Sequence, residues 1–391
     1  MEAFTSRARQ ERGTKRPLSL YIHVPFCVQK CSYCDFCSFP RRSEEEKARY
    51  VSRIIEDLHG FAPSASEYVV ETVYFGGGTP TLLQVSDFTA ILRAIAEHYA
   101  LSRDAEITAE CNPGTVDFAY LSALRQSGVN RLSVGLQSAN ENELRLLGRI
   151  HTVEDFLHTV KDARRAGFTN LSADLMFGIP DQTVESFRET LSFVLRAALE
   201  HISVYGLKIE EGTPFYARRD ALIFPDEDAE DAEEQMYLDA VSMLRDGGLL
   251  RYEISNFARP GYLSRHNYAY WTGQDYVGFG PAAHSYFAGE RFSNSRDFAA
   301  YLRGESIEDS RDRITHEEAL REHVMLHMRL EAGVSVAAYD RLAGESGAFL
   351  ARYGDAMQTY ACHGFIRETD DGFAFTTKGF RVSNYILSEI L

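Results

Sequence analysis

The regular alternation of short apolar segments with helical stretches predicts an α/β fold built on a parallel sheet. Two further observations refine this prediction. Glycine and polar residues gather where the apolar segments end, and the alternation stops near residue 290 of the 391 residues. In parallel α/β folds the carboxyl ends of the strands carry the active site. The sequence therefore predicts a large α/β domain with its site at one edge, followed by a smaller domain.

Six segments rich in β-branched residues and bounded by turn residues predict the strands. They are residues 18–24, 69–77, 106–111, 131–137, 170–178 and 201–209. Between them, apolar residues recur at helical spacing. These predicted helices are residues 44–58, 87–99, 117–128 and 153–167. Periodicity alone leaves open whether the sheet is doubly wound or curls into a barrel.

The last hundred residues have a different organisation. Residues 315–334 and 337–364 predict helices, and residues 365–387 predict a β-hairpin that turns at Asp370, Asp371 and Gly372 before a final helix. We therefore expect a flexible tail over residues 1–17, the α/β domain over residues 18–290, and a helical, winged-helix-like domain over residues 291–391.

Charge and hydropathy exclude several classes of protein. The net charge of −16 repels nucleic-acid backbones, and the basic run Arg7 to Arg16 is typical of a terminal tail. No apolar run is long enough to cross a membrane, and the first residues lack the apolar stretch of a secretory signal. We expect a cytoplasmic protein that binds no nucleic acid and whose cysteines stay reduced.

Four of the six cysteines lie between residues 27 and 37. Cys27, Cys31 and Cys34 have the spacing C-x3-C-x2-C, and Cys37 adds one more x2 step. Structural zinc commonly uses two separated C-x2-C pairs, and no second pair exists here. An iron–sulfur cube suits a tight loop better, because each thiolate binds a different iron. Three thiolates would leave one iron open for a small ligand.

The C-x3-C-x2-C motif directly after the first predicted strand resembles the signature of the radical S-adenosylmethionine (SAM) superfamily. This resemblance implies a [4Fe–4S] cluster on Cys27, Cys31 and Cys34, with SAM on the fourth iron and cleaved to a 5′-deoxyadenosyl radical. It also implies a partial (β/α)6 barrel. Cys37 is then a spare thiol, because a fourth protein ligand would take the place of SAM.

Further motifs resemble the oxygen-independent coproporphyrinogen III oxidases and their relatives, over roughly residues 18–290. They are YIHVPFC, GGGTPT, GLQS and DLMFGIPDQT. The glycine run suits close approach to the amino group of SAM. With the resemblance, the predicted SAM contacts are Tyr21, Tyr33, Gly76, Gly77, Gly78, Thr79, Glu110, Gln137, Arg149 and Asp174. Lys208 is a looser match.

Two features distinguish the oxidases from the related HemW family of haem chaperones. The oxidases have a fourth cysteine where this chain has Phe36, and a longer segment before the cluster than the 26 residues found here. The stretch RHNYAYW contains H-N-x-x-Y-W, which is typical of the HemW family. His266 is therefore the predicted haem ligand, and Tyr270 and Trp271 offer flat rings to a macrocycle.

The HemW resemblance implies haem as cargo, haem-accepting and possibly respiratory proteins as partners, an electron donor, and peripheral association with a membrane. An oxygen-independent coproporphyrinogen III oxidase is the alternative. His284 is a competing candidate for facing the ligand. His323 and His327, at i and i+4 of a predicted helix, fit a packing face better than a metal site.

Overall fold

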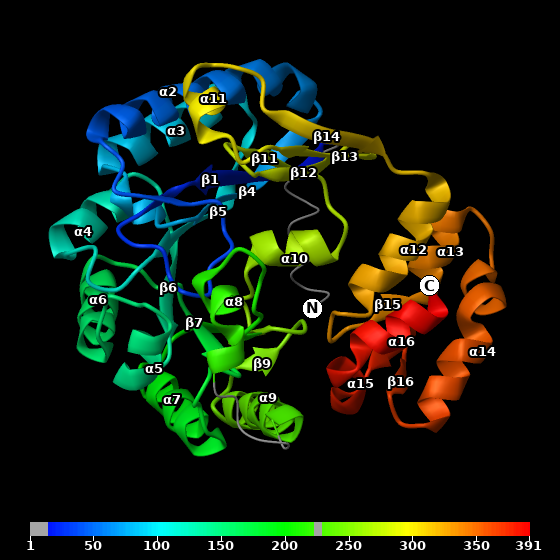
Figure 1. Cartoon of the computed structure of the whole chain (residues 1–391). Helices are drawn as coiled ribbons and strands as arrows, with labels where there is room; N and C mark the ends of the chain where they lie inside the picture. Colours follow the sequence, from blue (N-terminus) through cyan, green and yellow to red (C-terminus); the bar gives the residue numbers. More distant parts are fainter. Residues whose placement is uncertain (1–14, 223–228) are drawn as a thin grey trace.

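The computed structural model describes residues 15–222 and 229–391 of the chain. Its main feature is a curved twelve-stranded sheet with helices around its outer face (Figure 1). From edge to edge the strand order is β14-β13-β12-β11-β1-β4-β5-β6-β7-β8-β10-β9. Strands β1 and β4 to β8 are parallel to one another. The predicted six-stranded parallel core is therefore confirmed, and because its two ends do not pair, it forms a partial barrel.

The six core strands overlap the six predicted ones, although β5 begins five residues earlier and β8 ends three residues earlier than predicted. They are β1 (Arg16–Val24), β4 (Tyr68–Gly77), β5 (Leu101–Cys111), β6 (Arg131–Gln137), β7 (Leu171–Phe177) and β8 (His201–Gly206). Strand β1 begins two residues earlier than predicted, inside the segment expected to be a flexible tail. The Arg16 guanidinium bonds to Asp275 at 2.6 Å and lies over the ring of Tyr68. The rest of the predicted tail, up to residue 14, lies outside the described residues.

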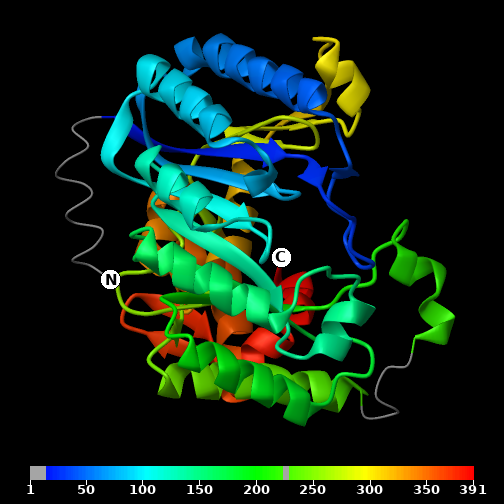
Figure 2. The same cartoon turned by 90° about the vertical axis from the view of Figure 1, so that its left-hand side faces the viewer.

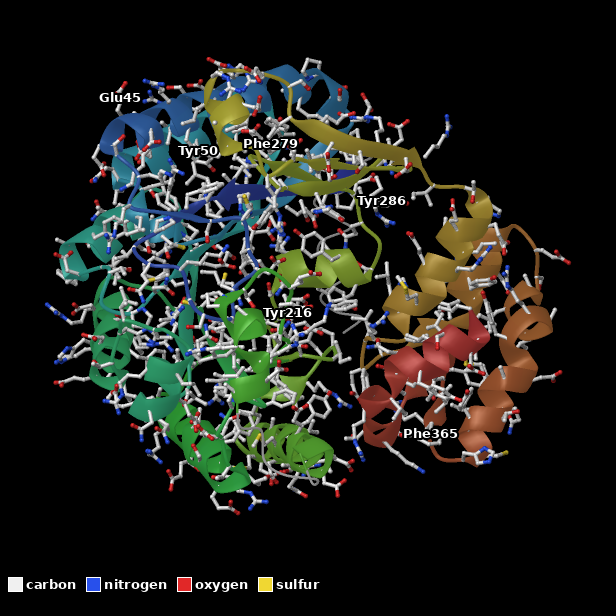
Figure 3. All side chains as sticks on the ribbon, in the orientation of Figure 1. Glu45, Tyr50, Tyr216, Phe279, Tyr286 and Phe365 are labelled. Carbon is white, nitrogen blue, oxygen red and sulfur yellow. The ribbon has the colours of Figure 1, made fainter. Side chains whose placement is uncertain are left out.

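Helices follow the core strands and cover the outer face of the sheet. They are α2 (Glu44–Phe61), α3 (Val85–His98), α4 (Phe118–Gln126), α5 (Glu141–Leu146), α6 (Val153–Arg165), α7 (Val184–Arg196) and α9 (Ala229–Asp246). Local sequence sets their starts: Ser43 and Glu46 form a capping box at α2, as Thr152 and Asp155 do at α6. Tyr50 of α2 is fully buried against the sheet (Figure 3).

Short elements complete the domain. They are β2 (Phe26–Cys27), β3 (Phe39–Pro40), α8 (Pro214–Ala217), α10 (Arg265–Trp271) and α11 (Phe298–Leu302), and three 3₁₀ turns at Ala62–Ala65, Pro80–Leu82 and Arg219–Ala221. Helix α10 lies on the inner side of the curved sheet, where the barrel remains open (Figure 1). It contacts β4 and a helix of the smaller domain.

The sheet continues beyond residue 290, where the sequence predicted the end of the domain. Strand β11 (Tyr276–Phe279) is parallel to β1, and β12 (His284–Phe287), β13 (Glu290–Asn294) and β14 (Glu308–Arg313) add to it antiparallel. On the opposite edge lie β10 (Asn256–Ala258) and β9 (Leu250–Arg251). The alternation of strands and helices stops because hairpins replace helical crossovers, while the sheet itself extends to Arg313.

The smaller domain combines helices with a three-stranded sheet. Its elements are α12 (His316–His327), β15 (Val334–Ser335), α13 (Val336–Ala343), α14 (Ala348–Cys362), β16 (Ile366–Thr369), β17 (Gly372–Phe375), α15 (Thr377–Arg381) and α16 (Ser383–Ile390). The predicted hairpin is present, and β15 adds a third strand beside it. The predicted helix 315–334 ends at His327, because the chain turns there into β15.

Polar contacts join the two domains. Arg291 of β13 forms a two-pronged salt bridge with Glu322 of α12 at 2.7 and 3.0 Å. The same guanidinium lies near the ring of Tyr286, on the side of the sheet that faces α12 (Figure 3). Among the described residues, no helix is both long and apolar enough to cross a membrane.

Candidate cofactor and ligand site

A cavity of about 320 Å³ opens at the carboxyl ends of the parallel strands. In Figure 2 the strands run across the view, and the blue segment after β1 lies at their right-hand end, near α5 and α8. Ten of the predicted site residues line this cavity. They are Cys27, Cys31, Tyr33, Cys34, Gly77, Gly78, Glu110, Gln137, Arg149 and Asp174. The structure thus brings together residues that lie up to 147 positions apart.

Residues 27–34, which carry Cys27, Cys31 and Cys34 and are called the cysteine segment below, are held in place by hydrogen bonds to neighbouring loops. The N–H of Ser32 donates to the carbonyl of Leu147 at 2.9 Å, and the N–H of Phe215 donates to the carbonyl of Ser32 at 2.9 Å. The side-chain amide of Gln29 donates to Gly148 at 3.3 Å. Because Leu147 and Gly148 follow β6 and Phe215 follows β8, the position of the cysteines depends on the loops after two strands of the barrel.

Cys27, Cys31 and Cys34 are half-buried at the cavity wall, whereas Cys37 is buried elsewhere, with its thiol 3.9 Å from the carbonyl oxygen of Arg296. Among the described residues, no three His, Cys, Asp or Glu side chains gather closely enough to hold one metal ion. A [4Fe–4S] cube does not require such gathering, because its irons are spread apart. Burial raises the pKa of Cys34 to about 11, so its thiolate needs a nearby cation such as iron.

The glycine run lets the cysteine segment pack against the end of β4. The N–H of Gly78 donates to Val24 at 2.9 Å, and a Cβ on Gly78 would lie 2.5 Å from the carbonyl oxygen of Phe26. Gly77 has φ of 108°, which favours glycine. Next to it, the Thr79 hydroxyl contacts the Cys27 sulfur at 3.8 Å. The glycines therefore seat the cysteine segment, and Gly77 and Gly78 also line the cavity.

Glu110, at the end of β5, is held from two sides. Its Oε1 accepts from the Tyr74 hydroxyl at 2.9 Å, and its Oε2 accepts from the N–H of Gly77 at 3.1 Å. Enclosure of the carboxyl group raises its pKa to about 7, with a further contribution from the nearby charge of Asp174. A cationic group bound in the cavity would favour the ionised form.

Arg149 connects the cysteine segment to two strands. Its Nη2 donates to Asn112 Oδ1 at 2.6 Å and to the carbonyl of Gly135 at 2.7 Å, and its Nη1 lies 3.5 Å from the sulfur of Cys31. A guanidinium in this position stabilises negative charge on the sulfur. Arg149 therefore helps to fix the position of the cysteine segment and stabilises negative charge on Cys31.

Gln137 and Asp174 lie on adjacent strands of the cavity wall. Gln137 has φ of 70° at the end of β6, an uncommon backbone conformation for a residue other than glycine and one that clusters at functional sites. Asp174 Oδ1 and Oδ2 accept from the hydroxyl of Ser133, each at 3.3 Å, and burial raises its pKa. Strands β6 and β7 thus place the side chains of Gln137 and Asp174 side by side in the cavity wall.

Some predicted site residues do not line the cavity. The Tyr21 hydroxyl lies 3.0 Å from Nδ1 of His23, and its ring stacks on Tyr74 at 6.2 Å between centroids. A Cβ on Gly76 would lie 2.8 Å from the Tyr74 ring. Lys208 is exposed and pairs with Glu210 at 2.6 Å, away from the cavity. His284 is exposed on β12 and does not line the cavity either.

His266, the predicted haem ligand, lies in the interior beside the cavity, only 1% exposed. Its Nδ1 is 2.8 Å from the Thr72 hydroxyl and its Nε2 is 2.8 Å from the Tyr270 hydroxyl. Burial lowers its pKa to about 3, so the ring is neutral. In this conformation neither ring nitrogen is open to haem iron, and Tyr270 itself packs on Tyr276. Within the H-N-x-x-Y-W stretch, Asn267 is the residue that lines the cavity.

Several cavity residues were not predicted from the sequence. They are Tyr74, Asn112, Arg131, Ser133, Tyr205 and Asn267. One signal was present in the segment RLSVGLQ, where Arg131, Ser133, Gly135 and Gln137 alternate with apolar residues. On a strand, residues two apart share one face, so this alternation indicates a polar interior wall. The remaining residues are identified only by tertiary contacts.

Comparison with known proteins gives consistent matches. The radical SAM superfamily matches residues 21–194. Haem chaperone HemW of Lactococcus lactis is 32% identical over 381 residues, which covers 96% of this chain and 98% of that protein. HemW of Escherichia coli is 38% identical over 302 residues, 76% of this chain and 78% of its own. The bovine mitochondrial radical S-adenosyl methionine domain-containing protein 1 is 41% identical over 275 residues.

The match to the bovine protein covers 70% of this chain but only 62% of the bovine protein's length. Among solved structures, coproporphyrinogen III oxidase HemN of Escherichia coli superimposes with a TM-score of 0.82 at 24% sequence identity. That superposition covers 99% of this chain and 92% of the oxidase. At this level of identity, the likeness establishes a shared fold that includes the C-terminal helical region.

Proposed function

Because the chain belongs to the HemW family of haem chaperones within the radical SAM superfamily, we propose that it binds haem and delivers it to acceptor proteins. The observation that carries this proposal is the alignment with the Lactococcus lactis chaperone, which spans almost all of both chains. Phe36 supports it, since it occupies the position at which the oxidases have a fourth cysteine. The proposed partners are haem-accepting proteins, such as respiratory proteins, and an electron donor for the cluster.

Membership of the superfamily implies a [4Fe–4S] cluster and SAM as cofactors. The residues present fit this pair, because three thiols meet a cavity that also presents the N–H groups, carboxylates and amide of the strand ends. Cys27, Cys31 and Cys34 would hold the cluster, and Gly77, Glu110 and other wall residues would hold SAM. When bound, the cluster supplies an electron to SAM. Arg149 meanwhile stabilises the charge on Cys31, and the glycine run keeps the cysteine segment seated.

We propose further that His266 is the haem ligand in a second arrangement of α10. Burial keeps its ring neutral, as metal coordination requires. Donation from Nδ1 to the Thr72 oxygen would fix the tautomer in which the Nε2 lone pair faces Tyr270. Coordination through Nε2 then requires that α10 shifts to expose this buried nitrogen and that the Tyr270 hydroxyl moves away from it. Haem would approach from the open side of the barrel, where α10 lies.

Haem transfer is the test of the main proposal. Reconstituted protein would be loaded with haem under anaerobic conditions and mixed with a haem-free respiratory cytochrome, and the absorbance of the cytochrome would be followed. We expect transfer from the loaded protein to exceed that from an equal amount of haem on serum albumin. Failure to bind haem, or transfer no faster than from albumin, would reject the chaperone function.

A parallel experiment tests the alternative, an oxygen-independent coproporphyrinogen III oxidase. The same preparation would be incubated with SAM, a reductant and coproporphyrinogen III, and vinyl product and carbon dioxide would be measured. We expect no turnover above that of a cluster-free preparation. Decarboxylation would identify the protein as an oxidase, irrespective of its haem affinity.

A further inference from the structure

Arg131 is a buried cation in the cavity wall, and its guanidinium forms no hydrogen bond or ion pair within residues 15–222 and 229–391. The residue is 1% exposed and opens β6, whose residues 133, 135 and 137 line the same cavity. Among the described residues, no side chain or carbonyl group hydrogen-bonds or ion-pairs with its guanidinium, and its Nε is buried without a partner. A buried charge without a partner costs several kcal/mol. The guanidinium therefore lacks a hydrogen-bond acceptor, and the carboxylate of a ligand can supply one.

The two carboxylates that line the same cavity already have other partners. Glu110 accepts from Tyr74 and Gly77, and Asp174 accepts from Ser133. They influence Arg131 only through space. Its guanidinium consequently retains its donors in the fork geometry that matches a carboxylate in two-pronged bonds.

Arg131 and Arg149 lie at different depths of the cavity. Arg149 donates to the carbonyl of Gly135 and to the sulfur of Cys31, which belongs to the cysteine segment. Arg131 lies four residues before Gly135 on the same strand, a rise of roughly 13 Å along the strand. Arg149 is therefore placed to bind an anion close to the cysteines. An anion bound by Arg131 would belong to a part of the ligand that extends farther into the barrel.

We propose that Arg131 binds a carboxylate of the small molecule held in this cavity. The proposal rests on the proposed function for its two sources of carboxylate, a haem propionate and the methionyl group of SAM. The depth of Arg131 favours the propionate. Arg131 is thus assigned as a ligand-recognition residue, in addition to the motif residues named above.

The test compares ligands that differ only in the carboxylate. Full-length reconstituted wild type, Arg131→Gln and Arg131→Lys would be titrated anaerobically with haem, haem dimethyl ester, SAM and decarboxylated SAM. We expect wild type to prefer haem over its ester by about 10- to 100-fold, as charge-assisted hydrogen bonds predict. Arg131→Gln should abolish this preference and Arg131→Lys should retain part of it. Arg145→Gln, an exposed arginine on α5, is the matched control and should leave every affinity unchanged.

Each outcome decides the proposal. If Arg131→Gln instead loses the preference for SAM over decarboxylated SAM, the carboxylate is that of SAM. If both members of each pair weaken equally, Arg131 only balances Glu110 and Asp174, and the proposal is wrong. If wild type binds no haem, the chaperone function fails while the SAM pair still tests Arg131. If Arg131→Gln does not fold, as thermal unfolding would show, equal binding of the paired ligands by wild type would reject the proposal.

Discussion

The Nε2 atom of His266 lies 2.8 Å from the hydroxyl oxygen of Tyr270, one turn farther along α10. The same hydroxyl occupies the position that an iron atom would need in order to reach this nitrogen. Haem coordination by His266 and the hydrogen bond to Tyr270 therefore exclude one another. Removal of the Tyr270 hydroxyl therefore tests whether His266 is the haem ligand.

Tyr270→Phe removes the hydroxyl and keeps the ring. We expect haem to bind about two- to tenfold more tightly, because a net hydrogen bond of about 0.5–1.5 kcal/mol no longer competes with iron. Anaerobic absorbance titration measures the affinity. Tyr268→Phe, two residues earlier in α10, is the control and should leave it unchanged. If Tyr270→Phe has no effect and His266→Ala binds haem like wild type, His266 only packs α10 against the sheet.

Cys34→Ser and Cys37→Ser should differ in their metal content. Cys34 faces the cavity, whereas Cys37 is buried beside the carbonyl of Arg296. After anaerobic reconstitution we expect Cys34→Ser to lose most of its iron and acid-labile sulfide, and Cys37→Ser to keep the wild-type content. Equal losses in the two variants would make Cys37 a ligand and would leave SAM no open iron.

Gly78→Ala should disturb the cysteine segment. The new Cβ would lie 2.5 Å from the carbonyl oxygen of Phe26, so we expect the free energy of unfolding to fall by about 1–3 kcal/mol and the iron content to fall with it. Gly60→Ala in α2 is the control, because nothing lies within 4 Å of its added Cβ. It should stabilise by about 0.5–1 kcal/mol through helix propensity. Urea unfolding measures both, and equal effects would refute the packing role of Gly78.

Glu110→Gln should change how stability depends on pH. The pKa of Glu110 is raised from its ordinary 4.5 to about 7, first by burial, so the folded protein holds a proton that the unfolded chain releases. Stability gained from this group is present below pH 4.5 and is lost as pH rises through 7. The loss is on the order of 3 kcal/mol for the ligand-free protein.

Urea unfolding at pH 5 and pH 8 checks this expectation. Glu110→Gln should be more stable than wild type at pH 8 and similar to it at pH 5. Glu189→Gln, on the exposed side of α7, should behave as wild type at both values. A wild type whose stability is flat over this range would place Glu110 in contact with more solvent than the structure shows.

The core of the fold was predictable because each parallel strand is a β-branched run that ends in turn residues. The added edge was not, because β14 (Glu308–Arg313) is exposed along its whole length and consists of charged residues and one serine. Such a strand has no apolar alternation that could indicate it. Its place in the sheet comes from pairing with β13.

The candidate site divides in the same way. Short motifs mark the cysteines, the glycine run and Gln137, because their roles depend on local spacing. Asn112 accepts a hydrogen bond from Arg149, and Arg131 lines the cavity. Both positions arise only when the sheet folds. The burial of His266 was equally hidden, because the sequence does not state which side of α10 meets β4.

The two outer strands of the sheet, β9 and β14, do not pair with each other. The smaller domain bridges the two edges instead, since Arg251 of β9 pairs with Glu331 at 2.7 Å and Arg291 of β13 pairs with Glu322 at 2.7 Å. Under the proposed function, a flat macrocycle would enter or leave along this seam once these contacts open, while the twelve-stranded sheet keeps every pair of neighbouring strands. A barrel closed by strand pairing would have no such route.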